Sequence, residues 1–250
     1  MIVVAFIAAF LAGTINALAG GGTLITFPTL LFLGLPSISA NVTSTVALSP
    51  GYFGATLAQK DLILTQKKRL WYVLPAGILG GLAGGWFLLN TGEKLFAQIV
   101  PYLIWGASLL LAVQEPVKRW VQQRRAHTAT THEHAEGWVG LLLWAGGVYG
   151  GYFGAGLGVI SLAVLGMALD DSLTRLNALK QSFSFSVNVT AAVFFVFSGQ
   201  VHWQIAGLMA VGALLGGSLG GRLAGKISPN SLRWLVVTIG VVVGFVYWLR

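Results

Sequence analysis

The sequence predicts an all-α, polytopic membrane protein made of two inverted repeats, each with one broken helical hairpin followed by three transmembrane helices. Of the 250 residues, 56% are hydrophobic and only 9% are charged, whereas an ordinary soluble domain has roughly 25% charged residues. Several apolar runs have the length of about 20 residues that a helix needs to cross a bilayer. Glycines interrupt two further apolar runs, and features of the first half recur in the second.

The first half begins with an apolar run at residues 2–36, which Ala19-Gly20-Gly21-Gly22 interrupts. No basic residue precedes this run, and no small-residue cleavage site follows it, so we interpret it as mature structure rather than a signal peptide. The glycines predict a helical hairpin with a broken centre. Three runs follow that are each predicted to cross the membrane: 42–58, 70–89 and 97–113.

The second half has the same organisation. Its apolar run at residues 138–169 is interrupted at Gly154-Ala155-Gly156-Leu157-Gly158, which predicts a second broken hairpin. The sequence does not specify whether the hairpin arms are half-length or full-length helices. Three predicted crossings follow, at 182–198, 203–221 and 232–249. We expect a first membrane repeat at 1–113, a cytoplasmic linker loop at 114–137 and a second repeat at 138–250.

A constant offset of 136 residues superposes the two halves without a gap. Under this offset Asn41 falls on Asn177, and the glycine cluster at 80–85 falls on the cluster at 216–221. Each hairpin returns to the side from which it started, and three crossings follow it. The second half must therefore begin on the opposite side of the membrane, so the repeats are predicted to be inverted.

The positions of the basic residues predict the orientation, because short loops rich in Lys and Arg stay in the cytoplasm. One orientation leaves only Lys94 and Arg250, of 15 basic residues, outside. Both termini are then predicted to be extracytoplasmic. The residues predicted to face the cytoplasm are Lys60, Lys67, Lys68, Arg69, Lys118, Arg119, Arg124, Arg125, Arg175, Lys180, Arg222, Lys226 and Arg233.

Several classes of function are disfavoured by composition. The formal charge of +8 is scattered between apolar runs, so no nucleic-acid partner is predicted. The absence of cysteine excludes disulfides and thiolate metal ligands. The linker contains His127, His132, Glu133, His134 and Glu136, but their spacing matches no known ligand pattern. We predict no enzyme activity, catalytic residue, metal or cofactor, because no His-Glu-x-x-His motif, paired carboxylates or nucleophile with a base is found.

The two glycine breaks are candidate substrate sites. Transporters built of inverted repeats bind substrate near the midplane, where discontinuous helices expose backbone groups. Helix N-termini attract anions, and glycine lets a ligand approach the backbone. The alternative is that glycines only permit close helix packing, which we favour for the clusters at 80–85 and 216–221. The candidate backbone donors are Gly20, Gly21, Gly22, Gly154, Gly156 and Gly158.

A polar segment follows each hairpin and leads into the next predicted span. At helical spacing its residues form two stripes that would line a path. The asparagines can instead cap helices and the hydroxyls can bond their own helices. Arg175 and Lys180 are either ordinary cytoplasmic charges or groups that recruit an anion. The candidate residues are Asn41, Thr43, Ser44 and Thr45, continued by Ser49 and Tyr52, and Arg175, Asn177, Lys180 and Gln181, continued by Ser184 and Asn188.

All seven acidic residues fall in predicted loops or at the ends of spans. A cation carrier or a carboxylate proton relay would be expected to bury at least one of them. The sequence therefore favours a small anionic substrate, moving alone or together with protons that the substrate itself carries.

Four motifs indicate a family: Ala-Gly-Gly-Gly in the first hairpin, Ala-Asn-x-Thr-Ser after it, Gly-x-x-Gly-Ala-Gly-x-Gly in the second hairpin and Arg-x-Asn-Ala-x-Lys beyond. The chain resembles the TauE/SafE family of sulfite exporters, also called the toluene sulfonate uptake permease family, over nearly its whole length. The resemblance implies a bacterial inner-membrane permease for sulfite, thiosulfate, sulfoacetate or other organosulfonates, in either direction. The site residues that the resemblance implies are the backbone of Gly20 to Gly22 and of Gly156 to Gly158, with Asn41, Thr43, Asn177 and Lys180.

The leading hypothesis is therefore an alternating-access transporter of small, sulfur-containing anions. A channel for anions or small solutes is the main alternative, since the same architecture supports one. An intramembrane enzyme lacks candidate catalytic residues, and an assembly factor lacks a loop long enough for docking. Substrate identity, direction, coupling ion and oligomeric state stay open at this point.

Overall fold

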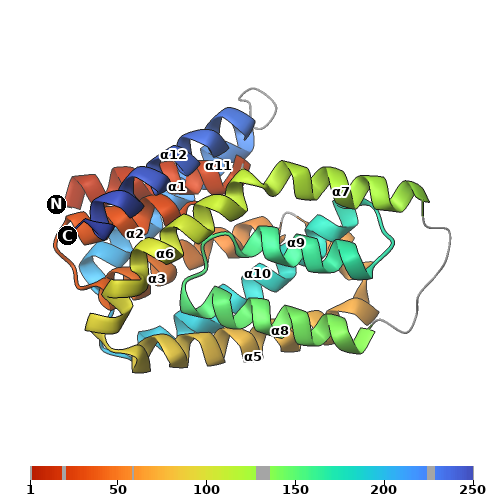
Figure 1. Ribbon diagram of the computed structural model, residues 1–250, viewed down its shortest axis with the longest axis horizontal. Coiled ribbons are helices and arrows are strands. Elements are labelled where there is room, and N and C mark those ends of the chain that lie inside the picture. Colours follow the sequence, from red (N-terminus) through yellow and green to blue (C-terminus); the bar gives the residue numbers. More distant parts are fainter. Residues whose placement is uncertain (1, 19–20, 58, 128–135, 224–228, 250) are drawn as a thin grey trace.

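The computed structural model describes residues 2–18, 21–57, 59–127, 136–223 and 229–249, which form twelve α-helices and, within these ranges, no strand (Figure 1). The prediction of an all-α protein is confirmed. The helices are α1 Ile2–Leu18, α2 Thr23–Phe32, α3 Ser37–Leu57, α4 Lys60–Leu64, α5 Lys67–Thr91, α6 Glu93–Ala112, α7 Gln114–His127, α8 Glu136–Tyr152, α9 Leu157–Ala168, α10 Leu173–Val196, α11 Trp203–Leu223 and α12 Pro229–Trp248.

Both predicted hairpins are interrupted near the expected glycines. Helices α1 and α2 have 17 and 10 residues, and α8 and α9 have 17 and 12. At a rise of about 1.5 Å per residue, the outer arm of each hairpin is roughly 25 Å long and the inner arm roughly 15–18 Å. Each hairpin therefore combines one nearly full-length helix with one half-length helix.

All six predicted crossings form helices of 20 to 25 residues: α3, α5, α6, α10, α11 and α12. Within the described ranges, three stretches are long and apolar enough to cross a membrane by composition alone: Lys67–Thr91, Glu93–Ala112 and Asn230–Trp248. Helices α3 and α10 are as long but carry the polar stripes noted in the sequence. A crossing helix tolerates such residues where they face protein or a cavity rather than lipid.

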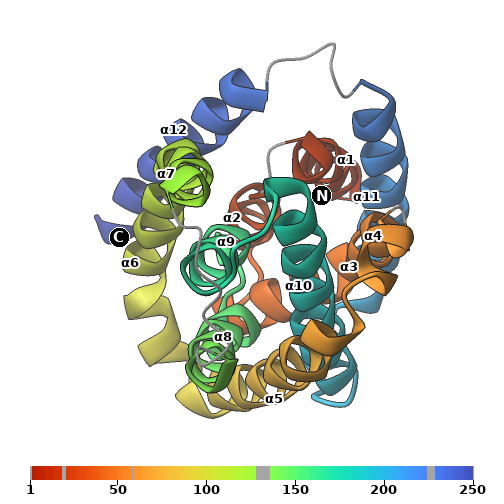
Figure 2. The same ribbon diagram turned by 90° about the vertical axis from the view of Figure 1, so that its right-hand side faces the viewer.

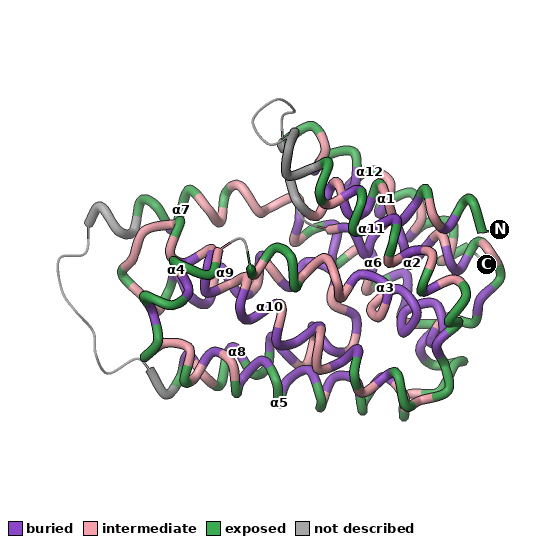
Figure 3. Tube along the Cα trace, turned by 180° about the vertical axis from the view of Figure 1, so that it is seen from behind, coloured by how far each residue is buried: buried purple, intermediate pink, exposed green. Residues whose placement is uncertain are grey.

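The helices with polar stripes lie inside the bundle. Seen end-on, α2, α3, α9 and α10 occupy the middle, and α5, α6, α8, α11 and α12 lie around them (Figure 2). Buried residues concentrate on these inner helices, whereas the outer helices expose many residues (Figure 3). Large exposed apolar side chains on the outer helices include Trp71, Leu109 and Val242. An apolar exterior around a polar interior is the arrangement expected of helices surrounded by lipid.

The glycine clusters of α5 and α11 allow two outer helix pairs to pack closely. A Cβ at Gly84 would lie 2.1 Å from the carbonyl oxygen of Val148 in α8, and a Cβ at Gly216 would lie 1.9 Å from that of Phe10 in α1. Neither position can hold a larger residue without separating the helices. The prediction that these clusters serve packing is confirmed for these positions. Helix α5 thus packs on α8, and α11, its counterpart at an offset of 136 residues, packs on α1.

The predicted linker begins with a helix, α7, rather than with a loop. Helix α7 lies along α9, where Val121 occupies the space beside Gly166. The Glu115 carboxylate accepts a hydrogen bond of 2.8 Å from Lys118 and lies 3.3 Å from Arg233 of α12. The hydrogen bond from Lys118 lowers the pKa of Glu115 below its usual value, against a smaller opposing effect of burial. Residues His132, Glu133 and His134 lie outside the described residues.

Candidate functional site

A cavity of about 660 Å³ lies between the two hairpin breaks. Its walls come from α1, α2, α3, α10 and α11, from the ends of α6 and α7, and from the segment that joins α8 to α9. Seven of the predicted site residues line this cavity: Gly21, Gly154, Gly156, Gly158, Asn177, Lys180 and Gln181. Residues from both halves of the chain, which are far apart in sequence, therefore share one space.

The second break presents the N-terminus of α9 to the cavity. Gly154 and Gly156 have φ values of +80° and +82°, a region that glycine adopts without the steric penalty of a Cβ. No side chain caps α9. The N–H of Val159 bonds to the carbonyl of Gly156 at 2.9 Å, whereas the N–H of Gly158 bonds to no described residue. Gly158 therefore offers a free donor at the positive end of the helix dipole.

Lys180 of α10 lies across the first turn of α9. A Cβ at Gly158 would lie 3.7 Å from the Cδ of Lys180, an ordinary van der Waals distance, so the lysine stem passes directly beside the start of α9. Lys180 is half-buried, and no described carboxylate lies within ion-pair distance of it. Lys180 and Gln181 follow Asn177 at a spacing of three and four residues, which places both near its face of α10. A lysine, two amides and a free helix N-terminus thus line the same cavity.

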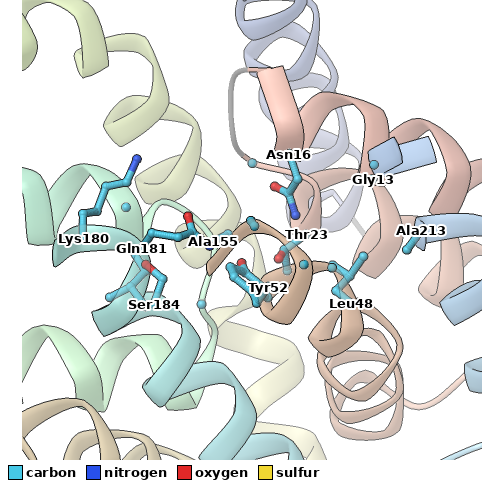
Figure 4. A pocket seen from close by; sticks show the side chains of 18 of the residues that line it. Gly13, Asn16, Thr23, Leu48, Tyr52, Ala155, Lys180, Gln181, Ser184 and Ala213 are labelled. Atoms are coloured by element: carbon cyan, nitrogen blue, oxygen red, sulfur yellow. The ribbon is translucent and has the colours of Figure 1, made fainter. Parts of the chain in front are cut away.

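The first break contributes an asparagine that the sequence analysis did not select. Asn16, in the last turns of α1, lines the cavity, and its Oδ1 accepts a hydrogen bond of 2.8 Å from the N–H of Gly22. Figure 4 shows Asn16, Thr23 and Tyr52 on one side of the cavity and Lys180, Gln181 and Ser184 on the other. Gly21 has a φ of +91°. Gly20 lies outside the described residues, and Gly22 does not line the cavity.

Three predicted residues in the first half of α3 do not line the cavity and bond to other parts of the protein, whereas Tyr52 further along α3 does line it. The Nδ2 of Asn41 donates to the carbonyl of Tyr152 at 2.8 Å, at the end of α8. The Ser44 hydroxyl pairs with Thr26 of α2 at 2.6 Å. Thr43 accepts from the N–H of His202 at 3.1 Å. All three predicted residues are buried, with 1% or less of each exposed.

Two other predicted residues also lie outside the cavity. The Thr45 hydroxyl donates to the carbonyl of Asn41 at 2.9 Å. It thus bonds within its own helix, which is the alternative role given above for the hydroxyls. Arg175 pairs with Asp171 at 2.8 Å, and Asp171 also pairs with Arg69 at the start of α5. Burial alone would raise the pKa of Asp171, but hydrogen bonds from two arginines and a backbone N–H lower it below its usual value. Arg175 is therefore neutralised within a cluster at one end of the bundle.

The cavity also contains residues that the sequence patterns did not select as site residues: Asn16, Thr23, Gln59, Gln114 and Lys118. Asn16 is a polar amide within an apolar run, immediately before the glycines. Its polarity at that place is a feature of the sequence from which a site residue could have been predicted. Lys118 lies in the predicted linker, so nothing in the sequence placed it beside α10. Among the described residues, no three His, Asp or Glu side chains gather as metal ligands would.

Comparisons with known proteins identify the family. Residues 5–247 match the family described as "Sulfite exporter TauE/SafE". The chain is 26% identical over 239 residues to a "Probable membrane transporter protein" of Haemophilus influenzae, covering 95% of this chain and 90% of that protein. It is 24% identical over 243 residues to the "Probable membrane transporter protein YfcA" of Escherichia coli, covering 96% and 87% of the two chains.

A third relative, the "Probable membrane transporter protein ORF9" of a Sinorhizobium species, is 27% identical over 245 residues, covering 94% of this chain and 88% of that protein. No solved structure matches the chain. The family match covers both hairpins, all six long inner and outer crossings and the cavity between them. The chain therefore belongs to the TauE/SafE family, and it is a multi-pass, non-enzymatic membrane transporter.

Proposed function

We propose that this transporter carries small sulfur-containing anions, such as sulfite, thiosulfate, sulfoacetate or another organosulfonate, across the bacterial inner membrane. The observation that carries the proposal is that Lys180, whose aliphatic stem lies beside Gly158, and the uncapped N-terminus of α9 line one cavity. A lysine and free backbone N–H groups both favour negative charge. The family description, which names sulfite, supports the sulfur-containing class.

The distribution of carboxylates supports an anionic substrate. Within the described residues, Glu93 begins α6, Glu115 lies in α7, and Asp171 precedes α10. None of the residues that line the cavity is acidic. Lys118 lines the cavity but is paired with Glu115, which leaves Lys180 as the lysine whose charge has no described partner there. A bound anion would supply the missing counter-charge.

The packing of the helices supports alternating access by two inverted repeats, one at 1–113 and one at 138–250. Helix α1 packs on α11 and α8 packs on α5, and these two pairs correspond at an offset of 136 residues. The chain enters the first hairpin at the end of the bundle that holds both termini and enters α8 at the opposite end (Figure 1). Hairpins that enter from opposite ends and meet at one cavity suit a site that faces each side in turn.

The described conformation suits an inward-facing state. The cavity reaches Gln59, before α4, and Lys118, in α7, and α7 extends toward the end of the bundle opposite to both termini (Figure 1). Most basic residues belong to this end by their place in the sequence, which by the positive-inside rule is the cytoplasmic one. In this orientation both termini are extracytoplasmic, and residues 114–137 lie in the cytoplasm.

Transport by purified protein in liposomes tests the proposal. We expect saturable uptake of radiolabelled sulfite, thiosulfate or sulfoacetate, and faster uptake when the same unlabelled anion is inside the vesicles. Such counterflow requires a carrier whose loaded site returns across the membrane. Linear, non-saturating flux without counterflow would indicate the channel alternative. Empty liposomes and the variant Lys180→Gln serve as controls, and no anion flux above that of empty liposomes would refute the proposal.

A further inference from the structure

We propose that Asn16 donates a hydrogen bond from the first hairpin to the transported anion, opposite Lys180, and so takes part in selecting anions. This inference rests on the proposed anion transport. Asn16 and Lys180 line the same cavity, from α1 and α10 respectively. Figure 4 shows both side chains and the space between the helices that carry them.

The hydrogen bond to the first break fixes which way the Asn16 amide faces. Its Oδ1 accepts the N–H of Gly22 at 2.8 Å, and a backbone N–H can pair only with the oxygen of an amide, not with its NH₂ group. The Nδ2 donors are therefore at the opposite edge of the planar amide group. Because Asn16 lines the cavity and is half-buried, these donors are available to a ligand.

Gly22 makes this arrangement possible. A Cβ at Gly22 would lie 2.9 Å from the Nδ2 of Asn16 and 2.7 Å from the carbonyl oxygen of Ala12. Any side chain at this position would push the amide away from the break. Gly22 does not line the cavity itself, so its contribution is to hold Asn16 at the cavity wall.

The choice of amide over carboxylate also favours an anion. An aspartate would accept the Gly22 N–H equally well, and its negative charge would suit the nearby N-terminus of α2. Asparagine supplies the same acceptor without a charge, and it adds two donors. The two residues thus differ in charge and in donors, and both differences favour a ligand with negatively charged oxygens.

The isosteric variant Asn16→Asp separates the two roles of the side chain. It keeps the acceptor for Gly22 and replaces the donor by a second acceptor. We expect sulfite, thiosulfate or sulfoacetate to bind about tenfold or more weakly, as for loss of a hydrogen bond to a charged group, while the melting temperature in detergent stays close to that of the wild type. Binding would be measured by isothermal titration and by the concentration dependence of liposome uptake.

Two further variants exclude simpler explanations. Asn16→Leu is uncharged and removes the same donor, so it too should bind these anions several-fold more weakly. Gln59→Glu adds the same charge to the cavity wall and should weaken binding less than Asn16→Asp does. The inference is overturned if Asn16→Leu binds as well as the wild type, or if Gln59→Glu matches Asn16→Asp. A wild-type protein that binds none of the three anions would instead refute the proposed function.

Discussion

The two halves of the chain use corresponding positions in opposite ways. Asn177, Lys180 and Gln181 of α10 line the open cavity. Their counterparts 136 residues earlier, Asn41, Ser44 and Thr45 of α3, bond within the protein. Similar polar segments therefore form a wall of the cavity in one half and a closed contact in the other. A protein that exchanges these two arrangements would open its cavity to the opposite side.

The closed contacts gather near the end of the bundle that holds both termini. Ser39 donates to Gln200 at 2.7 Å, and Thr43 accepts from His202, so the first turns of α3 bind the segment between α10 and α11. The Glu93 carboxylate accepts the N–H groups of Ser37 and Ile38 at the start of α3. These bonds close this end of α3, whereas the corresponding segment of α10 lines the cavity.

The variant Lys180→Gln should have the largest effect on substrate binding, because Lys180 is the charged member of the cavity wall in the second half. We expect affinity for sulfite or thiosulfate to fall by about 10- to 100-fold, equivalent to roughly 1.4–2.8 kcal/mol. Isothermal titration in detergent measures this change. Lys67→Gln removes an exposed charge from the start of α5 and should leave affinity within twofold, or about 0.4 kcal/mol. Equal losses of affinity in both variants would show that Lys180 contributes only general electrostatic attraction.

The paired variants Asn41→Ala and Asn177→Ala test the comparison directly. Asn41→Ala removes the donor to the Tyr152 carbonyl and should destabilise the protein by about 1–3 kcal/mol, seen as a lower melting temperature in detergent. Asn177→Ala should leave the melting temperature nearly unchanged, because Asn177 lines the cavity, and should weaken anion binding instead. Both variants should reduce transport. The reverse pattern, with stability lost at position 177 and kept at position 41, would contradict the comparison.

The Asp171 cluster should give the smallest effect, on stability alone. Its pKa is lower in the folded protein than in the unfolded chain, so the stability that it contributes is present above about pH 4 and is lost as the pH falls through the folded value. Asp171→Asn should therefore lower the melting temperature at pH 6 and flatten its decline between about pH 5 and pH 3. We expect a difference of about 1 kcal/mol or less, because the arginines are partly exposed. Asp61→Asn, an exposed residue, is the control and should leave the decline unchanged.

The broad architecture could be predicted because it depends on local sequence. Apolar length predicts the crossing helices, and glycines within apolar runs predict where helices must end. The packing role confirmed at Gly84 and Gly216 could be predicted because small residues every few positions let another backbone approach closely. The cavity positions Asn177, Lys180 and Gln181 could be selected because they form one face of a helix that follows a break.

The remaining features depend on which segments meet in space. Asn41 and Asn177 occupy equivalent positions, and nothing local to either predicts that one bonds to Tyr152 while the other lines a cavity. From the sequence alone, Arg175 and Lys180 are equally suitable to bind an anion. In the folded protein Asp171 pairs with Arg175. The polar sequence of residues 114–137 lacks an apolar run long enough for a crossing and therefore predicts a loop, whereas the structure forms α7 at Gln114–His127. Its packing on α9 arises only in the folded protein.

The contact between α6 and α12 has a further consequence. The indole nitrogen of Trp105 donates to the carbonyl of Val241 at 3.3 Å, and these residues are themselves counterparts, 136 positions apart. In the inverted-repeat arrangement proposed above, a contact between counterparts lies on the axis that relates the two halves. Points on that axis stay in place when the halves exchange conformations. A short covalent tether between α6 and α12 at this level is then expected to leave the transport cycle running.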